Sequence, residues 1–162
     1  MTVTHVHKDP ATLTMIVHAE FDADVARVWQ LWADPRRLER WWGPPTYPAT
    51  VGQHDLSVGG AVTYFMTGPQ GEKHHGWWRV REVAPPHRLV VEDGFADEHG
   101  VPNAAMPTMQ ARFELTPRDG GGTRVTITSV FQSVEQMEQL VAMGMEEGLK
   151  AAMGQMDAVL AE

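Results

Sequence analysis

Two adjacent carboxylates are the first candidates for acid–base chemistry. Glu92 and Asp93 end a strand predicted over residues 88–94, just before a polar loop. Side chains alternate across a strand, so one of the two must face the concave side of the sheet. If Asp93 is desolvated there, its pKa rises, and with His75 it could form the acid–base pair of a cyclase or hydrolase. The alternative is a salt bridge to Arg79, Arg81 or Arg112.

Other catalytic and metal-binding patterns are missing from the sequence. The eight histidines show no converging spacing beyond His5-Val6-His7, and of His74 and His75 only one can face inward. The chain has no cysteine, so disulfides, thiolate chemistry and cysteine metal sites are excluded. No Ser/His/Asp order, phosphate loop or nucleotide fingerprint occurs. We therefore expect neither a metal nor a cofactor, and the residues favour binding over catalysis.

The element that must position these residues is an amphipathic helix predicted over residues 133–162. Ser133 is its expected cap, with Gln136 as capping-box partner. Helical spacing gathers its large apolar residues on one face: Val134, Met137, Leu140, Val141, Met145, Leu149, Met153, Met156, Val159 and Leu160. A line of small residues, with Gln155 at its end, runs along the same face: Gly144, Gly148, Ala151 and Ala152. This line leaves room either for bulky side chains of the sheet or for a ligand.

Composition limits the partners. The chain has 162 residues and a net charge of −8, which argues against nucleic acid and anionic membranes, and no apolar run is long enough to span a bilayer. The lack of cysteine and of a signal-peptide core is typical of a cytoplasmic protein. We predict one domain over residues 1–162, with residues 1–11 as a loose N-terminal arm or an extension of the sheet edge. The oligomeric state is left open between monomer and homodimer.

Turn residues divide the rest of the chain into strands and two short helices. The predicted strands cover residues 13–21, 47–56, 61–67, 74–83, 88–94, 108–116 and 123–131. The short helices follow the first strand, and the second is capped by Asp34 with Pro35 at its first position. We predict an α+β fold in which about seven antiparallel strands form one curved sheet around the C-terminal helix. Trp29, Trp32, Trp41 and Trp42, near the short helices, could be core or an aromatic pocket rim.

Several motifs occur in the order found in a known superfamily. They are Phe21-Asp22-Ala23, Val28-Trp29, Trp32-Ala33-Asp34-Pro35, Trp41-Trp42-Gly43-Pro44, Asp55-Leu56-Ser57-Val58-Gly59-Gly60, Pro85-Pro86-His87-Arg88-Leu89 and Gly144-Met145-Glu146-Glu147-Gly148-Leu149. The chain thus resembles the START-like (SRPBCC) helix-grip superfamily, and more narrowly the bacterial single-domain members of the family named after the heat-shock-protein-90 ATPase activator homologues. Asp24 departs from the pattern, since many relatives have proline there. The resemblance implies a cavity between the sheet and the long helix.

Three functions are compatible with such a cavity. The first is binding of a small apolar or aromatic molecule, the second is an enzyme of the cyclase or hydrolase kind, and the third is a chaperone-interacting module. The predicted cavity wall comprises Trp42, Tyr64, Met66, Trp78, Phe113, Met145, Gly148, Leu149, Ala152 and Met153. Gln155, Asp93 or His75 would orient the ligand. Fold alone does not choose between these functions.

Overall fold

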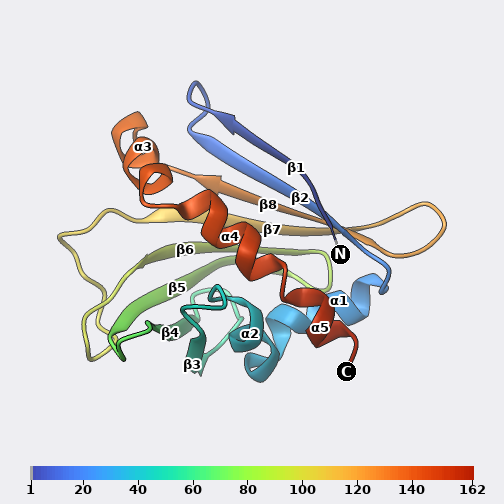
Figure 1. Ribbon diagram of the computed structural model, residues 1–162, viewed down its shortest axis with the longest axis horizontal. Helices are drawn as coiled ribbons and strands as arrows, with labels where there is room; N and C mark the ends of the chain where they lie inside the picture. The colour runs from blue at the N-terminus through green and yellow to red at the C-terminus, as the bar shows by residue number, and fades with distance from the viewer. Residues whose placement is uncertain (1) are drawn as a thin grey trace.

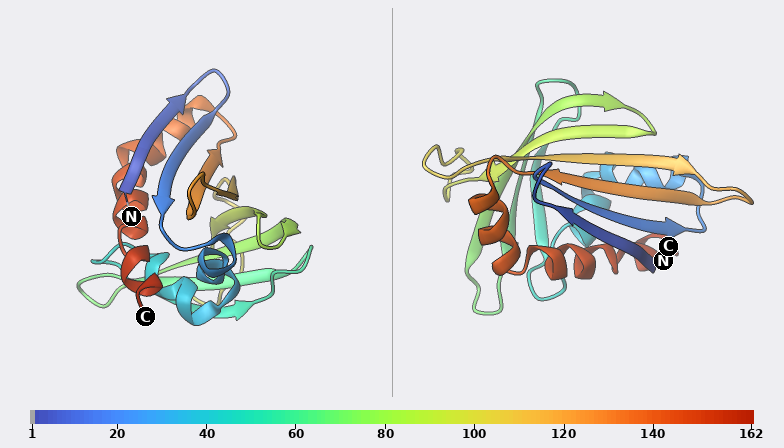
Figure 2. Two further views of the ribbon diagram at one scale, coloured as in Figure 1. Left: turned by 90° about the vertical axis from the view of Figure 1, so that its right-hand side faces the viewer. Right: turned by 90° about the horizontal axis from the view of Figure 1, so that it is seen from above.

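One curved antiparallel sheet forms the body of the protein. The computed structural model describes residues 2–162. The sheet has eight strands in the order β1-β2-β8-β7-β6-β5-β4-β3. Their bounds are β1 Thr2–Asp9, β2 Thr14–Phe21, β3 Ala49–His54, β4 Ala61–Thr67, β5 Lys73–Ala84, β6 Arg88–Phe95, β7 Met109–Pro117 and β8 Thr123–Val130. Figures 1 and 2 show the sheet bending around the C-terminal helices. This is the curved sheet around a C-terminal helix that the strand pattern predicted, and the helix-grip fold that the resemblance implied.

Five helices cover the concave face and one end of the sheet. They are α1 Val25–Ala33, α2 Pro35–Trp41, α3 Val134–Ala142, α4 Met145–Met153 and α5 Met156–Leu160. The Asp34 carboxylate accepts a hydrogen bond from the Arg36 N–H, 2.9 Å away, and Pro35 opens the helix as predicted. None of the helices in residues 2–162 is long and apolar enough to cross a membrane.

The prediction of one continuous helix over residues 133–162 is wrong in detail. Helix α3 ends at Ala142, and Gly144 has φ +91°, a left-handed conformation that only glycine adopts at little cost. The chain turns sharply there, so that α3 lies at a steep angle to α4 (Figure 2). A second interruption at Gly154 and Gln155 separates α4 from α5. Ser133 caps α3 as expected, because its hydroxyl accepts from the Gln136 N–H at 3.0 Å.

The N-terminal residues form a strand, so the prediction of a loose arm is wrong. Strand β1 pairs antiparallel with β2, with Val6 opposite Val17, and forms one edge of the sheet. The Lys8 ammonium group also donates to the Glu146 carboxylate of α4 at 2.6 Å. The alternative that the sequence left open, an edge extension, describes this segment. It explains why the sheet has eight strands where about seven were expected.

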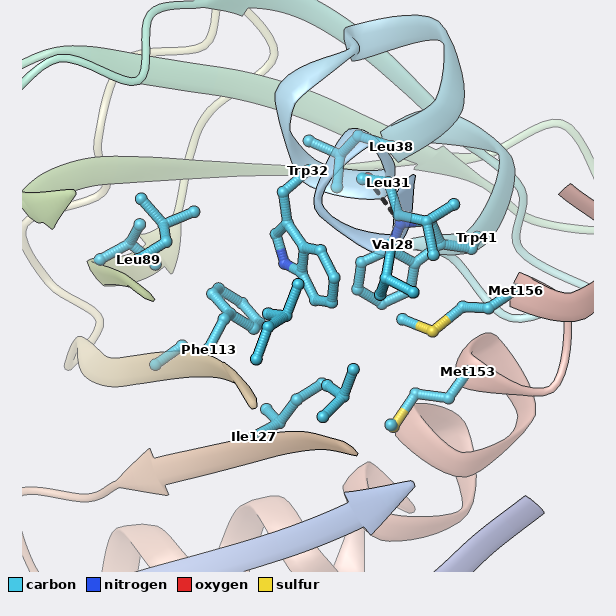
Figure 3. Close-up of a cluster of buried hydrophobic side chains, with 14 of the residues drawn as sticks. Val28, Leu31, Trp32, Leu38, Trp41, Leu89, Phe113, Ile127, Met153 and Met156 are labelled. Carbon is cyan, nitrogen blue, oxygen red and sulfur yellow. Dashed lines mark hydrogen bonds between the residues drawn. The ribbon is translucent and has the colours of Figure 1, made fainter. Parts of the chain in front are cut away.

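The hydrophobic core fills the end of the sheet where α1, α2 and α5 pack. Trp32, Trp41 and Phe113 are fully buried, and Met153 and Met156 reach them from the C-terminal helices (Figure 3). The Trp41 indole N–H donates to the Leu31 carbonyl at 2.8 Å, which ties α2 to α1. Of the four tryptophans considered as a pocket rim, Trp29, Trp32 and Trp41 are therefore core, and Trp42 remains for the site.

Candidate functional site

A cavity lies between the concave face of the sheet and helices α3 and α4. Its volume is about 290 Å³, close to the lower end of the range of small-molecule pockets. Most of its lining is apolar or aromatic. The lining residues are Trp42, Pro44, Tyr64, Met66, His74, His75, Gly76, Asp93, Gly94, Phe95, Pro107, Met109, Ala111, Phe113, Ile127, Ser129, Gln136, Leu140, Met145, Gly148 and Leu149.

The structure brings together seven of the residues predicted for the cavity wall. They are Trp42, Tyr64, Met66, Phe113, Met145, Gly148 and Leu149. Three of these come from the first half of α4, because that half crosses the open part of the sheet whereas its second half meets the core. Strand alternation brings in others that sequence reasoning did not select. Met109, Ala111, Ile127 and Ser129 share the face of Phe113 on β7 and β8, and their odd-numbered spacing was the signal.

Three predicted wall residues, and Gln155, lie elsewhere. Trp78, Ala152 and Met153 are buried in the core and do not line the cavity, because α1, α2 and α5 fill this part of the concave face. Gln155 is also absent from the cavity lining. Its side-chain amide donates to the Gly43 carbonyl at 2.6 Å and so fixes the loop after α2.

Gly148 exposes the backbone of α4 to the cavity. It lies inside the helix, and a Cβ placed on it would meet no atom within 4 Å. Of the two explanations given for the small residues, open space fits Gly148 and packed sheet side chains do not. The glycine widens the cavity at this point.

We predict that Gly148→Ala stabilises the protein. Alanine loses less backbone entropy than glycine in a helix interior, and no contact opposes the added methyl group. The expected gain in the free energy of unfolding is about 0.5–1 kcal/mol, measured by urea denaturation. A loss of stability would show that the space beside Gly148 is closed.

A half-buried hydrogen-bonded pair is the main polar feature of the wall. The Tyr64 hydroxyl on β4 donates to the Asp93 carboxylate on β6, with 3.0 Å between Oη and Oδ1. Between these strands lies β5, where Gly76 is directly opposite Tyr64. A Cβ on Gly76 would come within 2.4 Å of Cζ and Oη of Tyr64, so the missing side chain lets the phenol ring lie across β5.

Burial dominates the electrostatics of this pair. It raises the pKa of Asp93 from 3.8 to about 7, although hydrogen bonds from the Tyr64 hydroxyl and the Gly94 N–H favour the carboxylate. Burial and the nearby Asp93 charge likewise raise the pKa of Tyr64 well above its ordinary value. No Lys, Arg or His side-chain nitrogen lies within 4.0 Å of Asp93 in the described residues. The cavity therefore contains a carboxyl group that titrates near neutrality.

The neighbouring carboxylate has the opposite surroundings. Glu92 forms an ion pair with Arg81 and accepts a hydrogen bond from the Thr108 hydroxyl at 3.0 Å. Because adjacent residues of a strand face opposite sides, Glu92 is outside the cavity while Asp93 is inside. Both predicted outcomes are thus realised, the salt bridge by Glu92 and the desolvated carboxyl by Asp93.

His75 and Asp93 do not form an acid–base pair. The His75 ring packs against Phe65, its cross-strand partner, with 5.4 Å between ring centroids. Phe65 follows Tyr64 on β4, so its side chain is on the opposite face from Tyr64 and Asp93. His75 therefore reaches only the rim of the cavity. Within residues 2–162, no three His, Asp or Glu side chains are grouped so as to hold a metal ion.

The Gly76→Ala substitution should disrupt the Tyr64–Asp93 pair. The new methyl group would overlap the end of the phenol ring and force it to move. We expect a loss of about 1–3 kcal/mol in the free energy of unfolding, typical of overpacking. Urea denaturation measures it, with Gly148→Ala as the matched control that should change stability in the other direction. A neutral effect would mean that Tyr64 can leave Asp93 at no cost.

The curved antiparallel sheet, the helix α4 that it encloses and the apolar cavity between them define a helix-grip protein. The profile of the family described as Activator of Hsp90 ATPase homolog 1-like protein matches residues 22–161. The chain belongs to this family, as its motifs suggested.

Solved structures agree with this assignment. The crystal structure of protein Ms6760 from Mycobacterium smegmatis is 49% identical, covers 98% of this chain and 97% of its own, and has a TM-score of 0.90. A solution structure of a protein from Arthrobacter aurescens is 51% identical, with coverages of 99% and 92% and a TM-score of 0.93. Protein NE0264 from Nitrosomonas europaea is 26% identical, with coverages of 93% and 96% and a TM-score of 0.81. A search of curated proteins gave no significant match.

Proposed function

We propose that this protein binds a small, mostly apolar or aromatic molecule, in the cytoplasm, in the cavity between the sheet and helices α3 and α4. The observation that carries the proposal is the cavity itself, about 290 Å³ in volume and lined mainly by apolar and aromatic side chains. A few polar groups, among them the Tyr64–Asp93 pair, interrupt this lining. Pockets of this composition are typical of small-molecule sites.

Gly148 supports the same proposal. Glycine inside a helix costs about 1 kcal/mol relative to alanine. No side chain of the described chain fills the space that this glycine leaves open. A ligand that contacts the α4 backbone gives this position a role that packing does not.

The test is a thermal-shift screen of the purified protein against a library of apolar metabolites, repeated with Gly148→Leu. A ligand at a hundredfold excess over Kd stabilises the folded state by about 2.7 kcal/mol. We expect hits with the native chain that Gly148→Leu weakens at least tenfold, because leucine would occupy the cavity. Circular dichroism checks that the variant is folded. If no chemical class raises the unfolding temperature, the proposal fails.

An enzymatic role is the second candidate, and Asp93 is the observation that favours it. Burial gives this carboxyl a pKa of about 7, which suits a general base near neutral pH. The His75 ring faces away from Asp93, so Asp93 would have to act as the base without an acid partner from His75. Incubating each screening hit with the protein and following its mass tests this role. Conversion that Asp93→Asn abolishes would support catalysis, and unchanged hits would support binding alone.

A chaperone-interacting module is the third candidate, and the family assignment favours it. A pull-down with a purified chaperone of the heat-shock-protein-90 class tests it directly. Retention of this chain that is independent of cavity ligands would support the interaction. Absence of retention would leave the cavity as the site of function.

A further inference from the structure

The charges on the cavity wall are unbalanced. Asp93 is the one carboxylate among the lining residues, and no lysine or arginine is among them. The lining residues from β7, β8, α3 and α4 carry no titratable group. On β4 the titratable neighbour is Tyr64, and on β5 there are two, His74 and His75. The exposed His74 ring lies 5.7 Å from Tyr47 and 3.8 Å from the Glu72 carboxylate, and the His75 ring packs against Phe65. Within residues 2–162, no lysine, arginine or histidine forms an ion pair with Asp93.

Asp93 also has unused hydrogen-bonding capacity. An ionised carboxylate accepts about four hydrogen bonds. The Tyr64 hydroxyl supplies one at Oδ1, and the Gly94 N–H supplies another. A ligand in the cavity can donate to the positions that remain. A cationic ligand would also neutralise the negative charge of the Asp93 carboxylate, which a neutral hydrogen-bond donor cannot do.

Aromatic rings surround the same space. Trp42 and Tyr64 lie edge to face, with ring centroids 6.0 Å apart, and Phe113 lies 6.1 Å from Trp42. All three line the cavity beside Asp93. Aromatic faces attract ammonium groups, most strongly where water is excluded. A carboxylate that accepts a hydrogen bond, beside aromatic rings that attract positive charge, supplies both interactions by which proteins bind organic cations.

We propose that the ligand is an apolar amine, with an aromatic or aliphatic body in the cavity and its protonated nitrogen against the Asp93 carboxylate. This inference rests on the proposed function, since it names the chemical class that the same cavity takes. The ammonium group donates to Asp93, and the Tyr64 hydroxyl holds the carboxylate in place. The net charge of −8 favours the approach of a cation. Fatty acids and other carboxylates should bind more weakly than amines, because they would place a second negative charge beside Asp93.

Three compounds that differ in one group test this inference: 1-naphthylmethylamine, 1-naphthylmethanol and 1-naphthoic acid. Binding is measured by titration calorimetry at about pH 8, above the Asp93 pKa of about 7. We expect the amine to bind at least tenfold more tightly than the alcohol and the acid to bind most weakly. Charge-assisted hydrogen bonds are about twice as strong as neutral ones, which sets this scale.

Two variants assign the preference to one carboxylate. Asp93→Asn keeps the shape of the side chain and the Tyr64 hydrogen bond. It should abolish the preference, so that the amine and the alcohol bind with about equal affinity. Glu92→Gln is the matched control, because it removes the adjacent carboxylate on the outer face and should preserve the preference. Circular dichroism checks the fold of both.

The outcomes separate the two proposals. If the alcohol binds as tightly as the amine, cavity binding stands and the amine inference is overturned. If the preference for the amine survives in Asp93→Asn, or disappears in Glu92→Gln, the assignment to Asp93 is overturned. If none of the three compounds binds to the native chain, but the metabolite screen gives hits that Gly148→Leu weakens, the amine inference alone fails. If neither the titrations nor the thermal-shift screen detects binding, the proposed function is overturned as well.

Discussion

Replacing Asp93 by asparagine should make the folded protein more stable at pH 8 by about 2–4 kcal/mol. Most substitutions lower the free energy of unfolding, so an increase on replacing a half-buried polar residue is unusual. The reason is that burial raises the pKa of Asp93 from 3.8 to about 7, so that ionisation is unfavourable in the folded state. Asparagine has the same shape, can accept the Tyr64 hydrogen bond through its amide oxygen, and never ionises.

The effect should depend on pH with a definite sign. Below about pH 4 the carboxyl is protonated in both the folded and the unfolded chain, and the stability that it contributes is fully present. Between about pH 4 and pH 7 only the unfolded chain ionises, so this contribution decreases as the pH rises and is lost once the pH passes the folded pKa of about 7. The advantage of Asp93→Asn should therefore be near zero at pH 4 and largest at pH 8.

Urea denaturation of both proteins at pH 4, 6 and 8, followed by tryptophan fluorescence, measures this difference. Taking the difference between variant and native chain cancels the titration of the other acidic groups. Glu92→Gln controls for the loss of a carboxylate at an exposed ion pair, and it should change stability by less than about 1 kcal/mol at any pH. A pH-independent difference for Asp93→Asn would contradict the account of this site.

The largest loss of stability is expected for Trp41→Ala. Trp41 is fully buried, packs edge to face on Trp32 with 5.1 Å between ring centroids, and donates its indole N–H to the Leu31 carbonyl. The substitution removes a large core side chain and leaves that carbonyl without its partner. We expect a decrease of about 3–5 kcal/mol in the free energy of unfolding, measured by urea denaturation.

Trp42→Ala is the matched comparison for the adjacent tryptophan. The Trp42 ring borders the cavity, and its indole N–H makes no hydrogen bond of ordinary geometry within residues 2–162. Its removal should cost less than about 2 kcal/mol, because it enlarges an existing space and breaks no such bond. Ligand binding should weaken instead. Equal losses of stability for the two variants would contradict the division between core and cavity wall.

The fold could be predicted because its signals are local. Alternating apolar residues, hydrogen-bonding caps such as Asp34 and Ser133, and turn residues each act over a few positions. The interruption of the C-terminal helix could not be placed in the same way. Gly144 fits the apolar and small-residue pattern of a continuous helix, and only packing against the sheet decides that it adopts φ +91°. The N-terminal strand was missed for a different reason: its hairpin with β2 is local, but residues 2–9 lack the regular apolar alternation that marks a strand.

The candidate site could be predicted in its composition but not in its extent. Strand alternation correctly requires one of Glu92 and Asp93 to face inward, yet the β-strand pattern alone does not say which. Trp78 shares the face of Tyr64, so alternation places it correctly on the concave side. Whether that position is cavity or core depends on where α1, α2 and α5 end, and the sequence contains no local signal for this.

The most direct measurement is a ligand titration followed by the indole N–H resonances of the tryptophans in ¹H–¹⁵N NMR spectra. Trp42 lies on the cavity wall, whereas Trp77 lies on the outer face over Gly94 and donates to the Phe95 carbonyl at 3.0 Å. A hit from the thermal-shift screen should move the Trp42 indole signal and the Gly148 amide signal and leave the Trp77 indole signal unchanged. Shifts confined to Trp77 and the outer face, or no shifts at saturating ligand, would contradict a binding site between the sheet and helix α4.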